Sequence, residues 1–279
     1  MAGVLYLTAT PIGNLEDMTL RAVDVLRSVD LIAAEDTRHS RILMDHFDIK
    51  TPLTSYHEHN KYEKADKLIS LLLQGQDIAV VTDAGTPGIS DPGEVLAAKA
   101  IEAGIRVTSL PGACALITAL TMSAMPARRF VFEGFLPTDK KERTEVLTDL
   151  RDEKRTIILY EAPHRLKKTL TELLGALGDR RIVICRELTK IHEEAVPLML
   201  SETAAYYEAE EPRGEYVLIL AGKSREQLAA EQAERWEQVS PQEHLQHYLD
   251  QGLDRKEAMK KMAADLGLPK REIYKMLTD

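Results

Sequence analysis

Cysteine is scarce in this chain of 279 residues, which contains only Cys114 and Cys185. Both lie among apolar residues, and two thiols do not make the disulfide framework that holds small secreted proteins together. The N-terminus enters an apolar segment directly, without the basic region that opens a secretory signal peptide. These features are typical of a protein of the reducing cytosol, so we expect a cytoplasmic location.

Long apolar runs are also missing, with one partial exception at residues 107–127. Pro111-Gly112 interrupts this uncharged stretch and several Thr and Ser side chains dilute it, whereas a membrane helix needs about 20 predominantly apolar residues in a row. We therefore expect a buried strand followed by a core helix, and no membrane partner.

Two common catalytic signatures are absent as well. The chain has no Gly-x-x-x-x-Gly-Lys-Ser/Thr motif, which disfavours a phosphate-cleaving nucleotide enzyme. His57-Glu58-His59 lacks a third ligand at a recognisable spacing, so we predict a polar loop and no metal site. The net charge of −9 argues against steering of nucleic acid by the whole surface, but not against a local basic face.

The most distinctive segment that is present runs from Val80 to Gly93. Residues 78–81 predict a buried strand, and a helical pattern follows, with Asp91 as its expected N-cap and Pro92 at its first position. Three glycines and two prolines lie in this segment, and glycine lets a ligand approach the backbone closely. A strand, loop and helix of this kind bind small molecules at the carboxyl edge of open α/β sheets. The alternative, a plain turn, rarely needs about ten irregular residues.

Strand and helix patterns alternate through the first half of the chain, which predicts a mostly parallel sheet. From Phe130 the strands follow one another more closely, so we expect a mixed sheet there. We predict the α/β class, with an N-terminal α/β domain at 1–123, a second α/β domain at 129–223 and a C-terminal helical module at 240–279. A charged helical connector is expected at 224–239.

The tail has the helix, glycine turn, helix pattern of a helix-turn-helix. Between Arg255 and Lys275 it holds seven basic and three acidic residues, in contrast to the acidic chain as a whole. This local contrast favours a module that binds nucleic acid. A three-helix cap with solvated charges is the alternative.

Charged residues also follow an early strand. Leu31 to Ala34 predicts a strand that delivers Glu35, Asp36 and Arg38 to the carboxyl edge of the sheet. A functional cluster is one interpretation of these residues. The other is a helix N-cap at Asp36 or Thr37, which leaves Arg38 without a role.

Six motifs in order resemble the tetrapyrrole-methylase-like superfamily. They are Thr10–Leu15, Glu35–Arg38, Thr82–Gly93, Leu110–Gly112, Tyr160–Arg165 and Arg186–Lys190. Within the superfamily they are most similar to the bacterial enzymes that methylate cytidine 2′-hydroxyls of small-subunit ribosomal RNA, and the tail is similar to the C-terminal extension of these enzymes. Gly85-Thr86-Pro87 stands where tetrapyrrole methylases usually have Gly-Asp-Pro, which favours the RNA branch. A tetrapyrrole or protein acceptor, and a non-catalytic RNA-binding assembly factor, remain alternatives.

The resemblance implies S-adenosylmethionine as methyl donor, held in a cleft between the two α/β domains, and a homodimer. It implies small-subunit ribosomal RNA, or the assembled small subunit, as partner. By motif position the cofactor-binding residues are Pro11, Asp83, Ala84, Gly85, Ile89, Ser90, Pro111, Gly112, Ala113, Tyr160, Glu161 and Ala162.

A ribose hydroxyl becomes a good nucleophile only when a positioned base accepts its proton. The candidate bases are Glu35, Asp36 and His57, with Asp91 a lesser one, and Arg38 is expected to hold a phosphate beside the target ribose. Further phosphate contacts are predicted for basic residues of the second domain, of which Lys140, Lys141 and Arg143 are expected to be exposed. The full set is Arg128, Arg129, Lys140, Lys141, Arg143, Arg165, Lys167 and Lys168.

Overall fold

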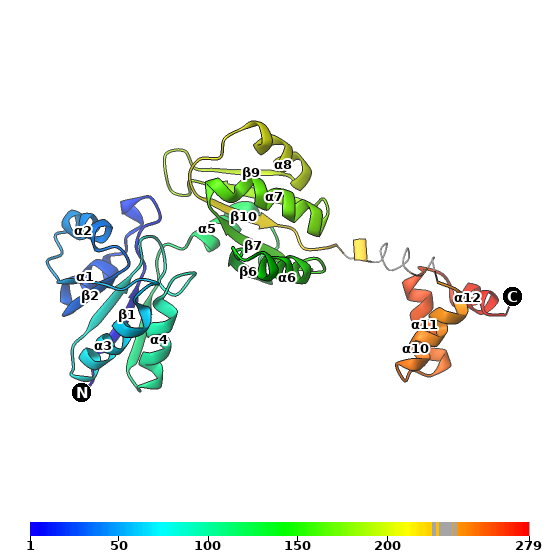
Figure 1. The fold of residues 1–279 in the computed structure, drawn as a ribbon, viewed down its shortest axis with the longest axis horizontal. Coiled ribbons are helices and arrows are strands. Elements are labelled where there is room, and N and C mark those ends of the chain that lie inside the picture. Colours follow the sequence, from blue (N-terminus) through cyan, green and yellow to red (C-terminus); the bar gives the residue numbers. More distant parts are fainter. Residues whose placement is uncertain (225–226, 229–235, 237–238, 279) are drawn as a thin grey trace.

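The computed structural model describes residues 1–224, 227–228, 236 and 239–278. Two α/β bodies lie side by side, and a group of three helices follows at the C-terminal end (Figure 1). This architecture confirms the predicted α/β class. Most of the helical connector expected at 224–239 lies outside the described residues.

The first sheet contains five parallel strands in the order β3-β2-β4-β1-β5. The alternation of apolar strands with amphipathic helices in the sequence therefore predicted its parallel character correctly. Its elements are β1 (Val4–Thr8), a short 3₁₀ turn η1 (Leu15–Asp17), α1 (Leu20–Ser28), β2 (Leu31–Ala34), α2 (Thr37–His46), β3 (Leu53–Ser55), α3 (Lys61–Leu73), β4 (Ile78–Val81), α4 (Gly93–Glu102) and β5 (Arg106–Leu110).

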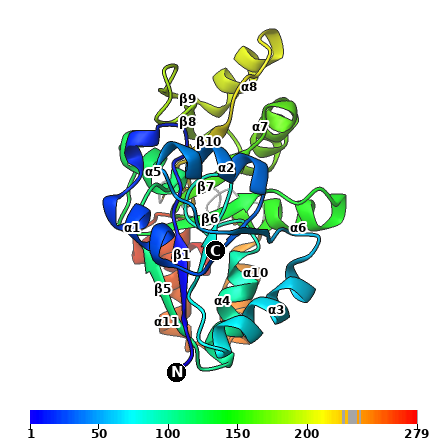
Figure 2. The same ribbon diagram turned by 90° about the vertical axis from the view of Figure 1, so that its left-hand side faces the viewer.

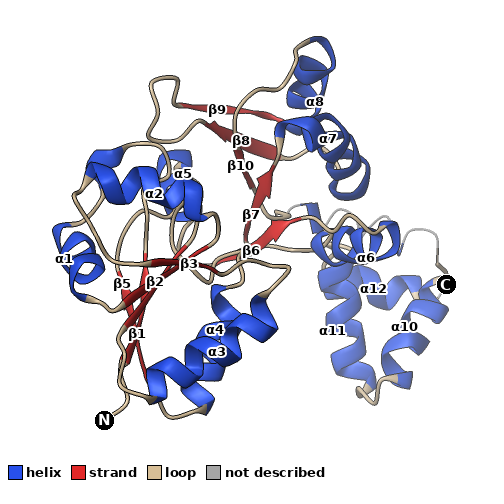
Figure 3. Ribbon diagram, turned by 60° about the vertical axis from the view of Figure 1, so that its left-hand side comes forward, coloured by secondary structure: helices blue, strands red, loops and turns tan. Residues whose placement is uncertain are grey.

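Helices cover both faces of this sheet (Figure 3). Leu26 of α1 and Met44 of α2 pack on one face, whereas Leu68 of α3 and Leu96 of α4 pack on the other. The neighbouring strands β1 and β4 therefore send their following helices to opposite faces. Connections that diverge in this way leave a crevice at the carboxyl ends of the strands, where ligands bind. These ends point toward the second sheet (Figure 2).

The second sheet has the order β6-β7-β10-β8-β9. Strands β6 and β7 are parallel and the other neighbours are antiparallel, which is the mixed sheet that the closer strand spacing predicted. Its strands and helices are β6 (Phe130–Phe135), α6 (Lys140–Leu150), β7 (Thr156–Glu161), α7 (Pro163–Leu177), β8 (Arg181–Arg186), β9 (Glu194–Met199), α8 (Leu200–Ala209) and β10 (Tyr216–Leu220).

One helix links the two bodies. Helix α5 (Ala115–Ser123) follows the first sheet in the chain, yet Leu116 and Leu120 pack against Ile158 and Ile219 of the second sheet. Helices α6, α7 and α8 cover the opposite face of that sheet. Because most residues of α5 are apolar, packing against the second sheet removes apolar surface from water. The helix that follows the first sheet in the chain therefore belongs to the core of the second body.

The three C-terminal helices, α10 (Pro241–Asp250), α11 (Arg255–Asp265) and α12 (Lys270–Met276), share a small core around Leu245, Met262 and Ile273. Ser240 and Glu243 form a reciprocal capping box at the start of α10, at the residue where the predicted helical module begins.

A buried polar cluster lies inside this module. The His244 ring stacks on Trp236 with a centroid separation of 3.6 Å, and its Nε2 lies 3.0 Å from Asp265. Asp265 also accepts a hydrogen bond from the Tyr248 hydroxyl. Burial lowers the pKa of His244, and the nearby Asp265 carboxylate opposes that shift. Among the described residues, no helix has the length and apolar character that spanning a bilayer requires.

Candidate active site

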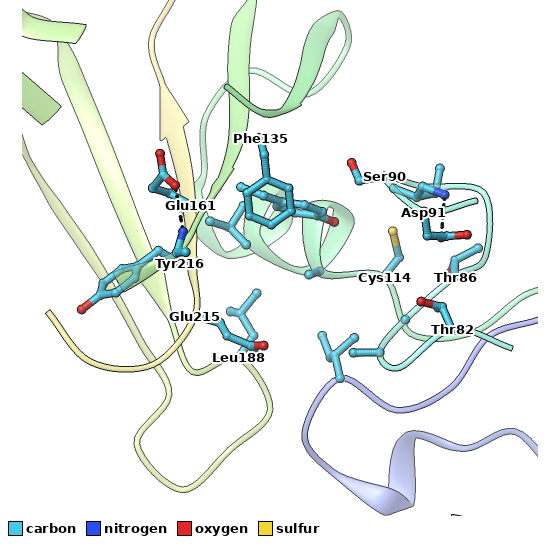
Figure 4. A pocket seen from close by; sticks show the side chains of 18 of the residues that line it. Thr82, Thr86, Ser90, Asp91, Cys114, Phe135, Glu161, Leu188, Glu215 and Tyr216 are labelled. Carbon is cyan, nitrogen blue, oxygen red and sulfur yellow. Dashed lines mark hydrogen bonds between the residues drawn. The ribbon is translucent and has the colours of Figure 1, made fainter. Parts of the chain in front are cut away.

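A cavity of about 480 Å³ lies between the two sheets, a size typical of small-molecule sites. One wall is the loop after β4, which contributes Thr82, Thr86 and Ser90 (Figure 4). The facing wall comes from the second body and includes Phe135 and Glu161. The cavity therefore exists only because the two bodies face each other.

Asp91 organises the loop between β4 and α4. The predicted helix start is wrong by one residue: α4 begins at Gly93, and Pro92 is its N-cap. The Asp91 carboxylate instead accepts hydrogen bonds from the backbone N–H groups of Gly88 (2.8 Å), Ile89 (3.2 Å) and Gly93 (2.8 Å). Since three backbone donors converge on it, the carboxylate anchors the loop that forms the cavity wall.

Hydrogen bonds between strand tips hold the floor of the crevice together. Thr10 and Gly85 exchange two backbone hydrogen bonds, of 2.9 and 3.1 Å. Gly85 has φ +85°, a conformation that glycine adopts without strain. The Thr82 hydroxyl donates to Glu35 Oε2 at 2.8 Å, and the backbone N–H of Asp36 donates to Asp83 Oδ1 at 3.0 Å. The ends of β1, β2 and β4 thus form one connected unit.

Of the four residues predicted to be catalytic, Glu35 alone lines the large cavity. Asp36 and Arg38 pair with each other at 2.9 Å, and hydrogen bonds from Arg38 lower the pKa of Asp36 to about 2. His57 lines neither described cavity; its Nε2 lies 3.3 Å from the Asn60 side-chain nitrogen, and its buried Nδ1 has no hydrogen-bond partner among the described residues.

The predicted cofactor-binding residues divide into three groups. The first group lines the large cavity and consists of Ala84, Gly85, Ile89, Ser90, Tyr160, Glu161 and Ala162. The second, Pro11 and Asp83, lines a smaller cavity of about 200 Å³. The third, Pro111 to Ala113, directly precedes Cys114 and Ala115 of the large cavity.

Sequence reasoning missed several residues that line the large cavity: Ile12, Thr82, Thr86, Cys114, Ala115, Phe135, Pro163, His164, Leu188, Glu215, Tyr216 and Val217. Phe135 ends β6 and Glu215 precedes β10, so a search for residues at strand ends would have included both. Which strand ends of the second sheet face the first sheet depends on the packing of the two bodies, and no local pattern carries that information.

A sequence model of the family described as "Tetrapyrrole (Corrin/Porphyrin) Methylases" matches residues 4–204, which is more than half of the chain. The chain belongs to this family. Among similar tetrapyrrole methylases are proteins called "Ribosomal RNA small subunit methyltransferase I" from Halalkalibacterium halodurans (49% identity), Bacillus subtilis (48%) and Synechocystis sp. (48%). Each match covers 98% of this chain and 93–97% of the relative.

Solved structures share the fold at lower identity. Uroporphyrin-III-C-methyltransferase from Thermus thermophilus superposes with a TM-score of 0.57 at 20% identity, over 78% of this chain and 94% of that one. A diphthine synthase gives a TM-score of 0.64 at 12% identity, over 80% and 91%. At these identities the similarity establishes the two-body fold of a tetrapyrrole methylase and nothing finer.

In this tetrapyrrole methylase a buried ionic network supports the wall of the second body. The Glu161 side chain is fully buried and accepts hydrogen bonds from Ala162 N and from the Thr169 hydroxyl. Its Oε1 also lies 3.5 Å from Arg165 Nε. A buried carboxylate needs such partners, because its desolvation is costly.

Arg143 belongs to the same network, and the prediction that it is exposed is wrong. Its side chain is 6% exposed; it donates to the Thr169 hydroxyl at 2.7 Å and pairs with Glu172. Arg143 is buried because α6 packs on α7. Its guanidinium balances the negative charge of carboxylates that lie beneath the cavity wall. Arg143 is therefore unavailable to an RNA phosphate, whereas Arg128, Arg129, Lys140 and Lys141 are exposed.

Proposed function

We propose that this chain transfers a methyl group from S-adenosylmethionine to the ribose 2′-hydroxyl of a cytidine in small-subunit ribosomal RNA. The observation that carries this proposal is the shared name of relatives that are 48–49% identical over 98% of the chain. The resemblance of the six sequence motifs to the RNA-methylating branch supports the 2′-hydroxyl of a cytidine as the methyl acceptor. The cavity between the two bodies supplies a site of suitable size.

The residues of the large cavity fit a cofactor with one apolar and one cationic part. Ile12, Ile89 and Leu188 offer apolar surface, and Gly85 presents backbone without a side chain. Carboxylates line the same cavity and favour a positive sulfonium centre. S-adenosylmethionine supplies an electrophilic methyl group and leaves as a neutral thioether, so no acid is needed on the leaving side. In this proposal the segment from Pro111 to Ala113 completes the cofactor site, whereas Pro11 and Asp83 face the smaller cavity.

Glu35 is the best candidate for the general base. Oε2 is held by the Thr82 hydroxyl, and Oε1 accepts no hydrogen bond from the described residues, so it is free to accept a proton. Asp36 is engaged by Arg38 and Asp91 by three backbone groups, which disfavours both as bases. Orientation of the acceptor beside such a base lowers the activation free energy by up to about 7–11 kcal/mol in well-aligned reactions.

The function is tested with labelled S-adenosylmethionine offered separately to small ribosomal subunits and to bare ribosomal RNA. We expect label on one cytidine ribose, and we expect the linkage after it to resist alkaline cleavage, because a methylated 2′-oxygen cannot attack the neighbouring phosphate. Label on a base, or transfer only to a tetrapyrrole or a protein, would refute the proposal. Binding of the cofactor without any transfer would favour the alternative of a non-catalytic assembly factor.

The basic face of the C-terminal module is proposed to hold RNA phosphates. All seven basic residues between Arg255 and Lys275 are exposed, and none forms an ion pair with a described residue. Replacing both Lys256 and Lys260 with Ala is expected to weaken RNA binding and to flatten its dependence on log salt by about 0.7–0.9 per lost phosphate contact. Titration of labelled RNA at several salt concentrations measures this slope.

Lys50→Ala is the matched control for that experiment, because Lys50 is exposed on the first body and pairs with Asp48. Its salt slope should equal that of the unmodified protein. If RNA affinity does not change with salt, or if both kinds of variant behave alike, the module has no electrostatic role in RNA binding.

We further propose that the chain forms a homodimer and works in the cytoplasm, where ribosomes are assembled. The family resemblance supports the dimer, as do exposed apolar side chains on α5 and β9, namely Ile117, Met122 and Val196. The two free cysteines are consistent with a reducing compartment. A monomer in sedimentation analysis at micromolar concentration would contradict the dimer.

A further inference from the structure

A second cavity adjoins the large one at the carboxyl edge of the first sheet. It measures about 200 Å³ and is lined by residues of the loop after β1, of helix α2 and of the tip of β4. Thr82 lines both cavities, and its hydroxyl binds Glu35, which lines the large one. The candidate base therefore lies at the boundary between the two spaces.

The second cavity has polar groups that the fold does not use. Asp83 is exposed; its Oδ1 accepts from Asp36 N, whereas its Oδ2 accepts no hydrogen bond from any described residue. Ser40 is 3% exposed, and its hydroxyl forms no hydrogen bond within the described part of the chain. Asp83 Oδ2 and the Ser40 hydroxyl are therefore both available to a ligand in this cavity.

Apolar groups complete the lining. Pro11 and Leu43 lie in the wall and offer surface to the face of a flat ring. A space of this size, with apolar walls and two unpaired polar groups, suits one aromatic heterocycle better than a flexible chain. The free carboxylate oxygen is an acceptor only, so the matching edge of the ring must carry a donor.

We propose that this second cavity binds the base of the acceptor nucleotide and selects a pyrimidine that carries an exocyclic amino group. This inference rests on the proposed function and extends it to the recognition of the acceptor. The amino group of cytosine donates to Asp83 Oδ2, whereas uracil presents a carbonyl oxygen that the carboxylate repels. A base seated here brings its ribose to the boundary where Glu35 lies. The nucleotide must be unstacked from its neighbours, as in other enzymes that act on an extruded nucleotide.

The decisive variant is Asp83→Asn. The amide introduced by this substitution retains a carbonyl oxygen for the Asp36 N–H and turns the free acceptor into an amino donor. We expect the unmodified protein, saturated with S-adenosylhomocysteine, to bind cytidine monophosphate about tenfold more tightly than uridine monophosphate. D83N should lose or reverse this preference while its affinity for S-adenosylmethionine stays unchanged. Calorimetry or ligand-observed NMR measures all three affinities.

Asp45→Asn is the matched control, because Asp45 is exposed on the same helix α2 and lines neither cavity. It makes the same change of charge and should keep the cytidine preference. Ser40→Ala should weaken the binding of both nucleotides while cytidine monophosphate still binds more tightly than uridine monophosphate.

Two results would overturn the assignment: equal binding of the two nucleotides to the unmodified protein, or a loss of S-adenosylmethionine affinity in D83N with the cytidine preference intact. The second result would place Asp83 in the cofactor site instead. Because these measurements need no methyl transfer, they remain decisive even if ribosomal RNA proves not to be the substrate.

Discussion

Glu35→Gln is expected to lower the rate of methyl transfer by about 10²–10⁴-fold, the usual contribution of a general base. Glutamine preserves the shape of the side chain and can still accept from the Thr82 hydroxyl, but it cannot take up the proton of the 2′-hydroxyl. Affinity for S-adenosylmethionine should stay within about threefold, because the strand tips remain tied together. Single-turnover transfer of labelled methyl groups and calorimetry measure the two quantities separately.

Two comparisons sharpen this experiment. Glu63→Gln changes an exposed carboxylate that pairs with Lys67 on α3, and it should leave transfer unchanged. Asp36→Asn tests the neighbouring carboxylate, whose partner is Arg38. It should lower the rate of methyl transfer far less than E35Q does. If E35Q transfers methyl groups at the normal rate while D36N or His57→Ala does not, the base is one of those residues and not Glu35.

Asp91→Ala is expected to weaken S-adenosylmethionine binding by about 10–100-fold, which corresponds to roughly 1.4–2.7 kcal/mol. The substitution removes the acceptor of three backbone N–H groups, and hydrogen bonds to a charged group contribute about 1.5–3 kcal/mol each to stability. Water molecules will replace some of the lost hydrogen bonds, and the loop after β4 will become less ordered. Ser90 has φ +64°, a conformation that a non-glycine residue keeps only while the surrounding contacts enforce it.

Calorimetric titration with S-adenosylmethionine measures this effect, and thermal unfolding separates it from a loss of the whole fold. Asp91→Asn keeps an acceptor oxygen and should bind the cofactor better than D91A. A D91A protein with normal cofactor affinity would show that the loop after β4 does not form the cofactor site. The contrast with E35Q is informative, since that change should affect transfer alone.

Much of the candidate site was predictable because short-range rules govern it. Residues 78–81 are uniformly apolar, and β4 is buried at every position. The glycines and prolines that follow predicted an irregular loop, and the structure places Ala84, Gly85, Ile89 and Ser90 of that loop in the cavity wall. Glu35 follows the apolar strand β2 directly, so its place at the carboxyl edge of the sheet also followed from the sequence.

The remaining features depend on contacts between distant parts of the chain. The Thr82 hydroxyl meets Glu35 across 47 residues, and no pattern in either segment specifies that pair. Arg143 looks like a solvent-facing helical residue until α6 packs on α7 and places it beside Thr169. Asp91 resembles an ordinary helix cap, but the turn of the loop brings two further N–H groups to its carboxylate.

The sequence by itself determined the order of strands and helices, the parallel and mixed character of the two sheets, and several of the segments that line the candidate site. Periodicity, capping and turn chemistry are local, and a single segment displays each of them. The tertiary structure decided which strand tips face one another, that α5 packs on the second sheet, and that Pro11 and Asp83 line a cavity apart from the large one. Those outcomes follow from how two sheets pack, and packing depends on the shapes of surfaces that many separate segments build together.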